Sequence, residues 1–351
     1  MVTVRRPLVV LAVNLGLLAL VAAVGELTFG PWLSSDPLDQ VSVPRDVRVR
    51  VTATGLYPGG GEFLYRRDHW GLRESGIPPE AVTILTMGGS TTNQLYLPQE
   101  RTWQAVLERA FKAHGRTVGV ANAGMDGQST IGTLTNLESW IPFIPGLKPK
   151  IILVYVGIND TNITGPVIDH LKYSSFHKRW VERSAIMRLI NTADGWLKAR
   201  RAKLNHTPVD YAHAEWTDRP NFADAEAAGI RPDPDGYRRR LELMIERIRA
   251  LGAVPVLVTQ ARGDARVEGG GVVGLVSADG LNGVDEYRLL ARFNAVTLEV
   301  CRAQAVACLD LAGELTFVDG DVYDHMHNSP QGAEKVGNWL YGKLAGLVPG
   351  G

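Results

Sequence analysis

The sequence has few cysteines, few aromatic residues and no excess of charge of either sign. Two cysteines in 351 residues cannot form a disulfide framework, and no Cys-x-x-Cys pair marks a zinc site. The 37 basic residues balance the 37 acidic residues, so the strong positive field of a general nucleic-acid-binding protein is absent. With 45% hydrophobic and 21% charged residues, the composition is that of a globular protein, not of a disordered or multi-span membrane chain.

Only one apolar run is long, and it lies at the N-terminus. Residues 7–25 are almost entirely apolar and follow Arg5 and Arg6. In a helix with a rise of ~1.5 Å per residue they span roughly 28 Å, enough to cross a bilayer core. A cleaved signal peptide is the alternative, with Ala23-Val24-Gly25 as its cleavage site. The length of the run favours an uncleaved anchor over residues 1–32, with the N-terminus inside the cytoplasm and the body outside.

The two cysteines, Cys301 and Cys308, lie seven positions apart. Cys301 is predicted at the end of a helix, and Cys308 lies in a short apolar run. Within a single helix their spacing of ~10 Å would exceed the reach of a disulfide. A turn between them would bring the sulfurs together, so a disulfide and two buried thiols are both open for a body outside the cytoplasm.

The rest of the chain divides into a lead-in and one domain. Residues 33–79 are rich in proline and glycine and predict an extended, turn-rich lead-in. In residues 80–351, short apolar runs alternate with segments of helical periodicity, and a last helix is predicted to begin at Ser329-Pro330. This alternation predicts an α/β fold whose parallel sheet has helices on both faces and binds ligands at the carboxyl ends of its strands. The predicted strands cover residues 82–87, 118–121, 151–156, 254–259 and 306–309.

Two long segments interrupt this alternation. Residues 160–235 form an insertion, and residues 261–284 form a glycine-rich loop. Loops of this length inside a compact domain are usually functional. Because the insertion directly follows Asn159, we predict that it shapes the substrate cleft.

Polar residues cluster directly after the predicted strands. Ser90 follows the first strand, Gly124 the second and Asn159 the third, while the stretch 324–327, Asp-His-Met-His, precedes the last helix. Because the carboxyl ends of parallel strands meet at one edge of a sheet, these residues are expected to converge. Acyl transfer needs this set: a hydroxyl nucleophile, an imidazole that takes its proton, a carboxylate that orients the imidazole, and donors for the oxyanion.

In these four segments the sequence resembles the SGNH, or GDSL-like, hydrolase family, over roughly residues 80–348. The lead-in residues 65–73 also resemble a segment that precedes the nucleophile in membrane-anchored members. The usual Gly-Asp-Ser-Leu is Gly-Gly-Ser-Thr at 88–91, and the missing aspartate has none of the chemical roles. The Gly-x-Ser-x-Gly turn of the α/β-hydrolases is absent, because Thr92 replaces its second glycine. The resemblance implies a flavodoxin-like three-layer α/β/α sandwich with a five-stranded parallel sheet.

The resemblance also implies the site residues. The family's four named residues fall on Ser90 as nucleophile, Gly124, Asn159 and His327 as base, with Asp324 three positions before the histidine. The oxyanion donors would be the main-chain N–H groups of Ser90 and Gly124 and the side-chain amide of Asn159. No cofactor and no metal is expected.

The substrate implied by the resemblance is an acylated small molecule or carbohydrate. An esterase of this kind would remove small O-acyl groups, such as acetyl, from envelope or secreted carbohydrate. An O-acetyltransferase for an exported polysaccharide shares the first half-reaction and is one alternative. A catalytically idle carbohydrate-binding domain is another. The expected partners are that substrate and the membrane, through the N-terminal helix, but no nucleic acid.

The sequence allows three other roles for residues in or near this site. Asp160 could orient His327 in place of Asp324. His325 and His327 have the His-x-His form of metal ligands, although no cysteine or His-Glu-x-x-His motif accompanies them. Gly124 could be required only by the space available at a tight turn.

Overall fold

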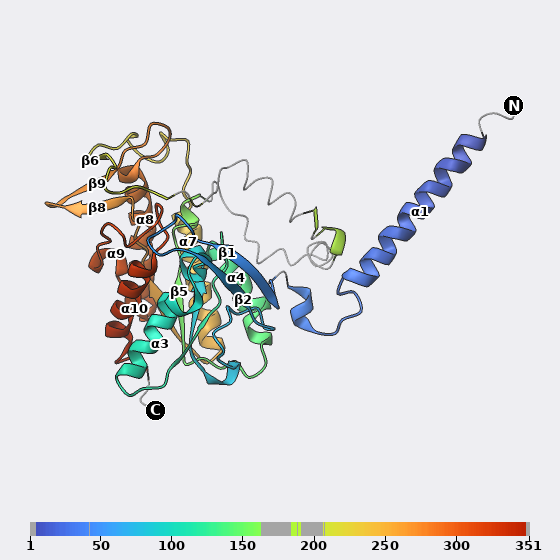
Figure 1. The fold of residues 1–351 in the computed structure, drawn as a ribbon, viewed down its shortest axis with the longest axis horizontal. Coiled ribbons are helices and arrows are strands. Elements are labelled where there is room, and N and C mark those ends of the chain that lie inside the picture. The colour runs from blue at the N-terminus through green and yellow to red at the C-terminus, as the bar shows by residue number, and fades with distance from the viewer. Residues whose placement is uncertain are drawn as a thin grey trace. The chain divides into compact units, whose positions relative to one another are not determined.

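The computed structural model describes residues 5–41, 43–162, 184–187, 189–190, 206 and 208–348 (Figure 1). The chain forms two compact units, residues 1–43 with 169–205 and residues 44–168 with 206–351.

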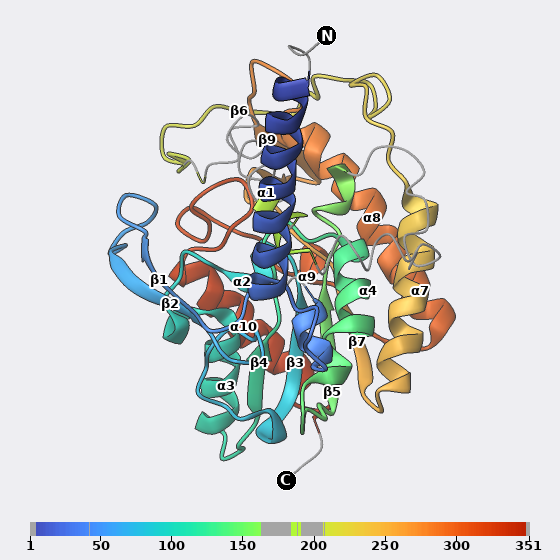
Figure 2. The same cartoon turned by 90° about the vertical axis from the view of Figure 1, so that its right-hand side faces the viewer.

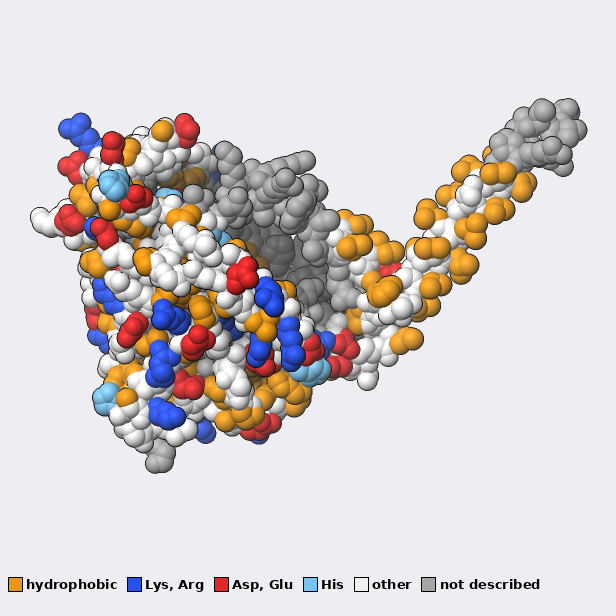
Figure 3. Space-filling model, in the orientation of Figure 1, with side chains coloured by type: hydrophobic (Ala, Val, Ile, Leu, Met, Phe, Trp, Pro, Cys, Tyr) orange, Lys and Arg blue, Asp and Glu red, His pale blue; other side chains and the backbone are white. Residues whose placement is uncertain are grey.

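The first unit contains the N-terminal apolar run as a single helix, α1 (Arg5–Phe29). Its segment Leu8–Phe29 is long and apolar enough to cross a membrane or to serve as a signal sequence. Apolar side chains cover the visible surface of this helix in Figure 3. Near its C-terminal end, Glu26 accepts hydrogen bonds from Ser184 Oγ and from the main-chain N–H groups of Ala185 and Ile186.

The second unit is built on a five-stranded parallel sheet, as predicted. Its order is β10-β7-β5-β3-β4, so the chain adds β4 on one side of β3 and β5 on the other. The carboxyl ends of β3 and β5 therefore flank a point where the strand order reverses, which is where open α/β sheets bind ligands. The strands are β3 (Val82–Gly88), β4 (Gly119–Asn122), β5 (Ile151–Tyr155), β7 (Val254–Val258) and β10 (Ala307–Leu309).

Helices cover both faces of this sheet, which makes the predicted three-layer sandwich (Figure 2). On one face, α3 (Trp103–Ala113) packs against α10 (Pro330–Leu344); a Cβ at Gly337 would lie 2.7 Å from Trp103 O, so glycine permits this close approach. On the other face, α7 (Pro234–Ala250) packs against α4 (Thr130–Ser139) and α8 (Gly283–Gln304). The last helix begins where predicted, because Ser329 Oγ accepts from the N–H groups of Gln331 and Gly332.

The lead-in, predicted as extended and turn-rich, contains two strands that the prediction did not name. β1 (Val47–Thr52) and β2 (Glu62–Arg67) form an antiparallel pair. Alternating valine and arginine over residues 47–51 is the period-two pattern of such a strand, so a sequence signal was present. The Arg73 N–H donates to Asn122 O over 2.9 Å, which joins the lead-in to the last residue of β4.

The insertion and the glycine-rich loop contribute to one small sheet. β6 (Trp216–Thr217) pairs with β9 (Gly271–Leu275), and β9 pairs with β8 (Ala265–Glu268), all antiparallel. Gly269 and Gly270 join β8 to β9 and have positive φ of 58° and 84°. Tight two-residue hairpin turns with positive φ at both central residues favour glycine there. The predicted loop is therefore largely a hairpin. Residues 163–183 and 191–205 of the insertion lie outside the described residues.

The structure joins the two cysteines. Cys301 lies in the last turn of α8 and Cys308 in β10, and their sulfurs form a disulfide with a Cα–Cα distance of 5.8 Å. Ala305, with φ of 51°, ends the helix in the left-handed region and reverses the chain between them. Of the two possibilities left open by the sequence, the structure has the disulfide.

Candidate active site

Ser90 lies at the start of α2 (Ser90–Asn93), directly after β3. The two preceding glycines let the end of β5 and the loop after it come close to this turn. A Cβ at Gly88 would lie 2.3 Å from Tyr155 O, and one at Gly89 would lie 2.4 Å from Asn159 Nδ2. Glycine at both positions therefore brings the Asn159 amide against the main chain that presents Ser90.

Ser90, His327 and Asp324 form a continuous hydrogen-bonded chain. Ser90 Oγ lies 2.7 Å from His327 Nε2, and His327 Nδ1 lies 2.7 Å from Asp324 Oδ2. The serine and the histidine are partly exposed, whereas the aspartate is buried. The predicted nucleophile, base and carboxylate are thus brought together in the order that acyl transfer requires.

The Asp324 carboxylate is held by donors from its own loop and from beyond it. The main-chain N–H groups of Met326 and His327 donate to Oδ1 over 3.0 and 2.8 Å. Burial would raise the pKa of Asp324, but hydrogen bonds from His206 and His327 hold this pKa far below its ordinary value. The carboxylate is therefore ionised over the whole working range of an imidazole base.

His206 is a member of this cluster that the sequence reasoning missed. Its Nδ1 lies 3.1 Å from Asp324 Oδ2, and its ring centroid lies 4.5 Å from that of His327. It comes from the predicted insertion, and no periodicity or motif connects it with a residue more than a hundred positions away. Its position could be found only from the tertiary structure.

Asp160 does not contact His327, so it does not replace Asp324. Its carboxylate is buried and accepts from the Thr130 main-chain N–H over 3.1 Å and from the Thr130 hydroxyl. Arg240 Nη2 lies 3.4 Å away. Burial raises the pKa of Asp160 to about 6 in spite of these partners. Asp160 thus fixes the loop that carries Asn159 to α4 and α7.

Asn159 and Ser90 each have an N–H that is not used by another described residue. Asn159 Nδ2 donates to Gln128 O over 2.8 Å, which holds the side chain beside Ser90 and leaves its second amide hydrogen for another acceptor. The Ser90 main-chain N–H has no hydrogen-bond partner among the described residues. Gln260 ties the two loops together, accepting from the Ile158 N–H over 2.6 Å and donating to Thr91 Oγ1 over 2.9 Å.

Gly124 does not fit its predicted place among the donors. Its N–H already donates to Asn122 Oδ1 over 2.9 Å, and the residue is buried. A Cβ there would lie 2.4 Å from Asn93 N, so glycine is needed for α2 to pack on this loop. Gly127, three residues on, is exposed, has φ of 71°, and its N–H has no partner within the described part of the chain. The steric interpretation of Gly124 agrees with this geometry.

The His-x-His pair does not form one site. His325 Nδ1 lies 3.3 Å from Asp264 Oδ2, and Asp264 also forms a buried ion pair with Arg262, whereas His327 Nδ1 pairs with Asp324. Among the residues that the structure describes, His206, Asp324 and His327 have ligand atoms within 4.8 Å of one another, which is close enough to hold a metal ion. The hydrogen bonds already described account for their approach without one.

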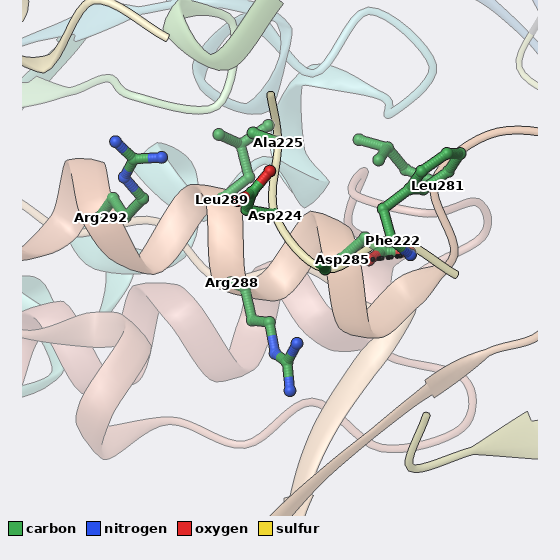
Figure 4. Close-up of a pocket in the computed structure, with 9 residues that line it drawn as sticks. Phe222, Asp224, Ala225, Leu281, Asp285, Arg288, Leu289 and Arg292 are labelled. Carbon is green, nitrogen blue, oxygen red and sulfur yellow. Dashed lines mark hydrogen bonds between the residues drawn. The ribbon is translucent and has the colours of Figure 1, made fainter. Parts of the chain in front are cut away.

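A pocket lies away from this cluster, where residues 222–225 cross α8 (Figure 4). The Phe222 N–H donates to Asp285 Oδ1 over 3.2 Å, which fixes this part of the insertion to the first turn of the helix. None of the residues that line the pocket belongs to the Ser90 cluster. It is separate from the candidate active site.

Comparison with known proteins gives distant structural relatives and one family. The crystal structure of TesA is 16% identical over 75% of this chain and 98% of its own, with a TM-score of 0.44. A lipase/acylhydrolase from Enterococcus faecalis is 17% identical over 77% of this chain and 99% of its own, with a TM-score of 0.44. The acetyl xylan esterase AlAXEase is 12% identical over 74% of this chain and 98% of its own, with a TM-score of 0.44. No curated protein sequence matches. The model of the GDSL-like lipase/acylhydrolase family matches residues 86–335, and the chain therefore belongs to this family.

Proposed function

We propose that this protein is a serine-dependent acyl ester hydrolase in which Ser90 carries the acyl group. The observation that carries the proposal is the unbroken hydrogen-bonded chain from Ser90 Oγ through His327 to the Asp324 carboxylate. A serine hydroxyl is a weak nucleophile unless a base takes its proton as it attacks. Membership of an acylhydrolase family supports the same chemistry.

The first half-reaction forms an acyl-enzyme. Ser90 Oγ attacks the ester carbonyl carbon while His327 Nε2 takes the hydroxyl proton. Asp324 stabilises the resulting imidazolium and fixes its tautomer. The bond to the leaving oxygen then breaks, and His327 donates the proton to that oxygen. In the second half-reaction water attacks the acyl group with His327 again as base, which releases the acid and restores Ser90.

The oxyanion of each tetrahedral intermediate needs donors that are free in the resting protein. We assign the Ser90 main-chain N–H and the second amide hydrogen of Asn159 to this role. We assign no third donor, because the Gly124 N–H is already bonded to Asn122.

The proposed substrate is a small O-acyl ester, such as acetyl, on envelope or secreted carbohydrate. The apolar helix over Leu8–Phe29 supports a place at the membrane. Arg5 and Arg6 before it favour a topology with the body outside the cytoplasm. Fractionation with protease treatment of spheroplasts tests this topology. Recovery of full-length protein in the cytosolic fraction, or a protease-resistant body, would contradict it.

The activity is tested with the full-length protein in detergent and an activated acetyl ester, with and without an oligosaccharide acceptor. Ser90→Ala serves as the matched inactive protein, and mass analysis follows both products. Acetate release with an acetylated Ser90 intermediate is the expected result. Acetyl transfer to the oligosaccharide in preference to water would make the protein an O-acetyltransferase. No turnover by the folded parent on any acyl ester would leave the carbohydrate-binding alternative.

A further inference from the structure

Two imidazoles share one carboxylate oxygen in the Ser90 cluster. Asp324 Oδ2 lies 2.7 Å from His327 Nδ1 and 3.1 Å from His206 Nδ1. An ionised carboxylate only accepts hydrogen bonds, so both Nδ1 atoms must carry a proton and both must donate. His206 is therefore held in the same tautomer as His327 and by the same acceptor.

The two rings differ in what their other nitrogen meets. His327 Nε2 contacts Ser90 Oγ, whereas His206 Nε2 has no hydrogen-bond partner among the described residues. His206 is partly buried, and its ring packs on Tyr96 and His327, each at a centroid distance of 4.5 Å. Tyr323 Oη lies 3.2 Å from its Nδ1. These contacts fix the ring beside the triad.

Among the described residues that face His206, Asp324 is the one that carries a charge. Burial raises the pKa of Tyr96 and of Tyr323, with the charge of Asp126 acting in the same direction, so both phenols remain neutral where imidazoles titrate. Among the described residues, the negative charge nearest to His206 is thus the one that His327 also uses.

We propose that His206 is a positioning residue that shares the Asp324 carboxylate with His327 and thereby sets the strength and direction of the hydrogen bond between His327 Nδ1 and Asp324. Asp324 attracts a proton to His327 by stabilising the imidazolium. A second N–H donor on the same oxygen draws on the same negative charge and weakens that attraction. The donor also fixes the carboxylate plane, which sets the direction of the His327 ring. This inference rests on the proposed function for its kinetic consequences only.

The test compares two substitutions at His206 in the full-length protein. His206→Phe keeps a ring against Tyr96 but removes the donor, and His206→Asn places a neutral amide N–H near the position of Nδ1. We expect the acidic limb of the kcat/KM profile for an activated acetyl ester to move to higher pH by about half a unit to one unit in His206→Phe. His206→Asn should stay close to the parent, and KM should change little in both. His213→Phe is the matched control, because His213 pairs with Asp210 on the exposed surface.

A second measurement does not depend on turnover. In protein with ¹⁵N-labelled histidine, the downfield resonance of the His327 Nδ1–H should shift in His206→Phe and return toward the parent value in His206→Asn. An unchanged resonance together with an unchanged pH profile in folded His206→Phe would overturn the inference. A rise in KM with an unchanged profile would also overturn it and make His206 a substrate contact. A shifted resonance in a protein without ester activity would keep this inference and refute the proposed function.

Discussion

The guanidinium of Arg73 lies 2.6 Å from the carbonyl oxygen of Gln94, the residue that ends the short helix beginning at Ser90. The same guanidinium donates to the carbonyl oxygens of Asn93 and Leu97. Arg73 is only 2% exposed, and burial lowers its pKa to about 10, so it is still charged at neutral pH. A residue of the lead-in thus fixes the turn that presents the predicted nucleophile.

We expect Arg73→Met to lower both the stability and the reactivity of Ser90. Three buried carbonyl oxygens would each lose a donor, and that of Leu97 would keep no other among the described residues, which should cost about 2 to 4 kcal/mol of unfolding free energy. Arg73→Lys should recover little, because one ammonium cannot reproduce the planar fork. Urea unfolding and the rate of fluorophosphonate labelling of the folded protein measure the two effects. Arg50→Met, on the exposed side of β1, is the control, and equal behaviour of Arg73→Met and this control would refute the role.

Ser90→Ala and His327→Ala should each reduce kcat by ~10³-fold or more, and the double variant should lose no more than either single one. The reason is that the nucleophile and its base act as one unit through the 2.7 Å contact. A fluorophosphonate should label Ser90 in the parent and barely in His327→Ala. His69→Ala, an exposed histidine, is the control. Label on a different residue, or activity in folded Ser90→Ala, would refute the assignment.

Asn159→Ala should reduce kcat by ~10²- to 10³-fold with a small change in KM, because the amide acts on the oxyanion more than on the bound ester. Labelling of Ser90 should persist, since the serine and His327 remain in place. Steady-state kinetics with the activated ester measures the split. Asn221→Ala removes an exposed amide that binds Ser277 O and Gly280 O, and it should leave kcat unchanged. A loss confined to KM would make Asn159 a ground-state contact.

The pair of His325 and Asp264 should make stability depend on pH. Its hydrogen bond and charge raise the pKa of His325 above 6.5, so the stabilisation is fully present below pH 6.5 and is lost as the pH rises through the raised value. The difference in melting temperature between the parent and His325→Gln should therefore be larger at pH 6 than at pH 8. Calorimetry at both values tests it, and His114→Gln is a surface control. A constant difference would contradict the pairing.

The disulfide should survive in protein isolated from the membrane fraction without reductant. Alkylation under denaturing conditions should then leave the mass unchanged until the bond is reduced. The Cys301→Ser, Cys308→Ser double variant should lose about 2 kcal/mol of unfolding free energy, because the bridge closes a short loop. Alkylation of both thiols before reduction would indicate a reducing location and contradict the proposed topology.

The sequence alone predicted the strands of the sheet and most of the residues that cluster at its edge. Periodicity is local, so apolar runs and helical spacing located all five strands and the helix that begins after Ser329. The carboxyl ends of parallel strands meet at one edge, so Ser90, Asn159 and the loop of Asp324 and His327 were expected together. The apolar run at the N-terminus was recognisable by its length and composition alone.

Tertiary structure decided the questions that depend on contacts between distant residues. In the folded chain His327 contacts Asp324 and not Asp160, and His325 pairs with a different carboxylate from His327. The Gly124 N–H is bonded to Asn122, the two cysteines form a disulfide, and His206 contacts Asp324. A hydrogen bond requires two atoms to lie within about 3 Å, and its direction is set by the loops that carry them. No sequence period encodes that distance between residues more than a hundred positions apart, so only the folded chain determines which imidazoles the Asp324 carboxylate holds.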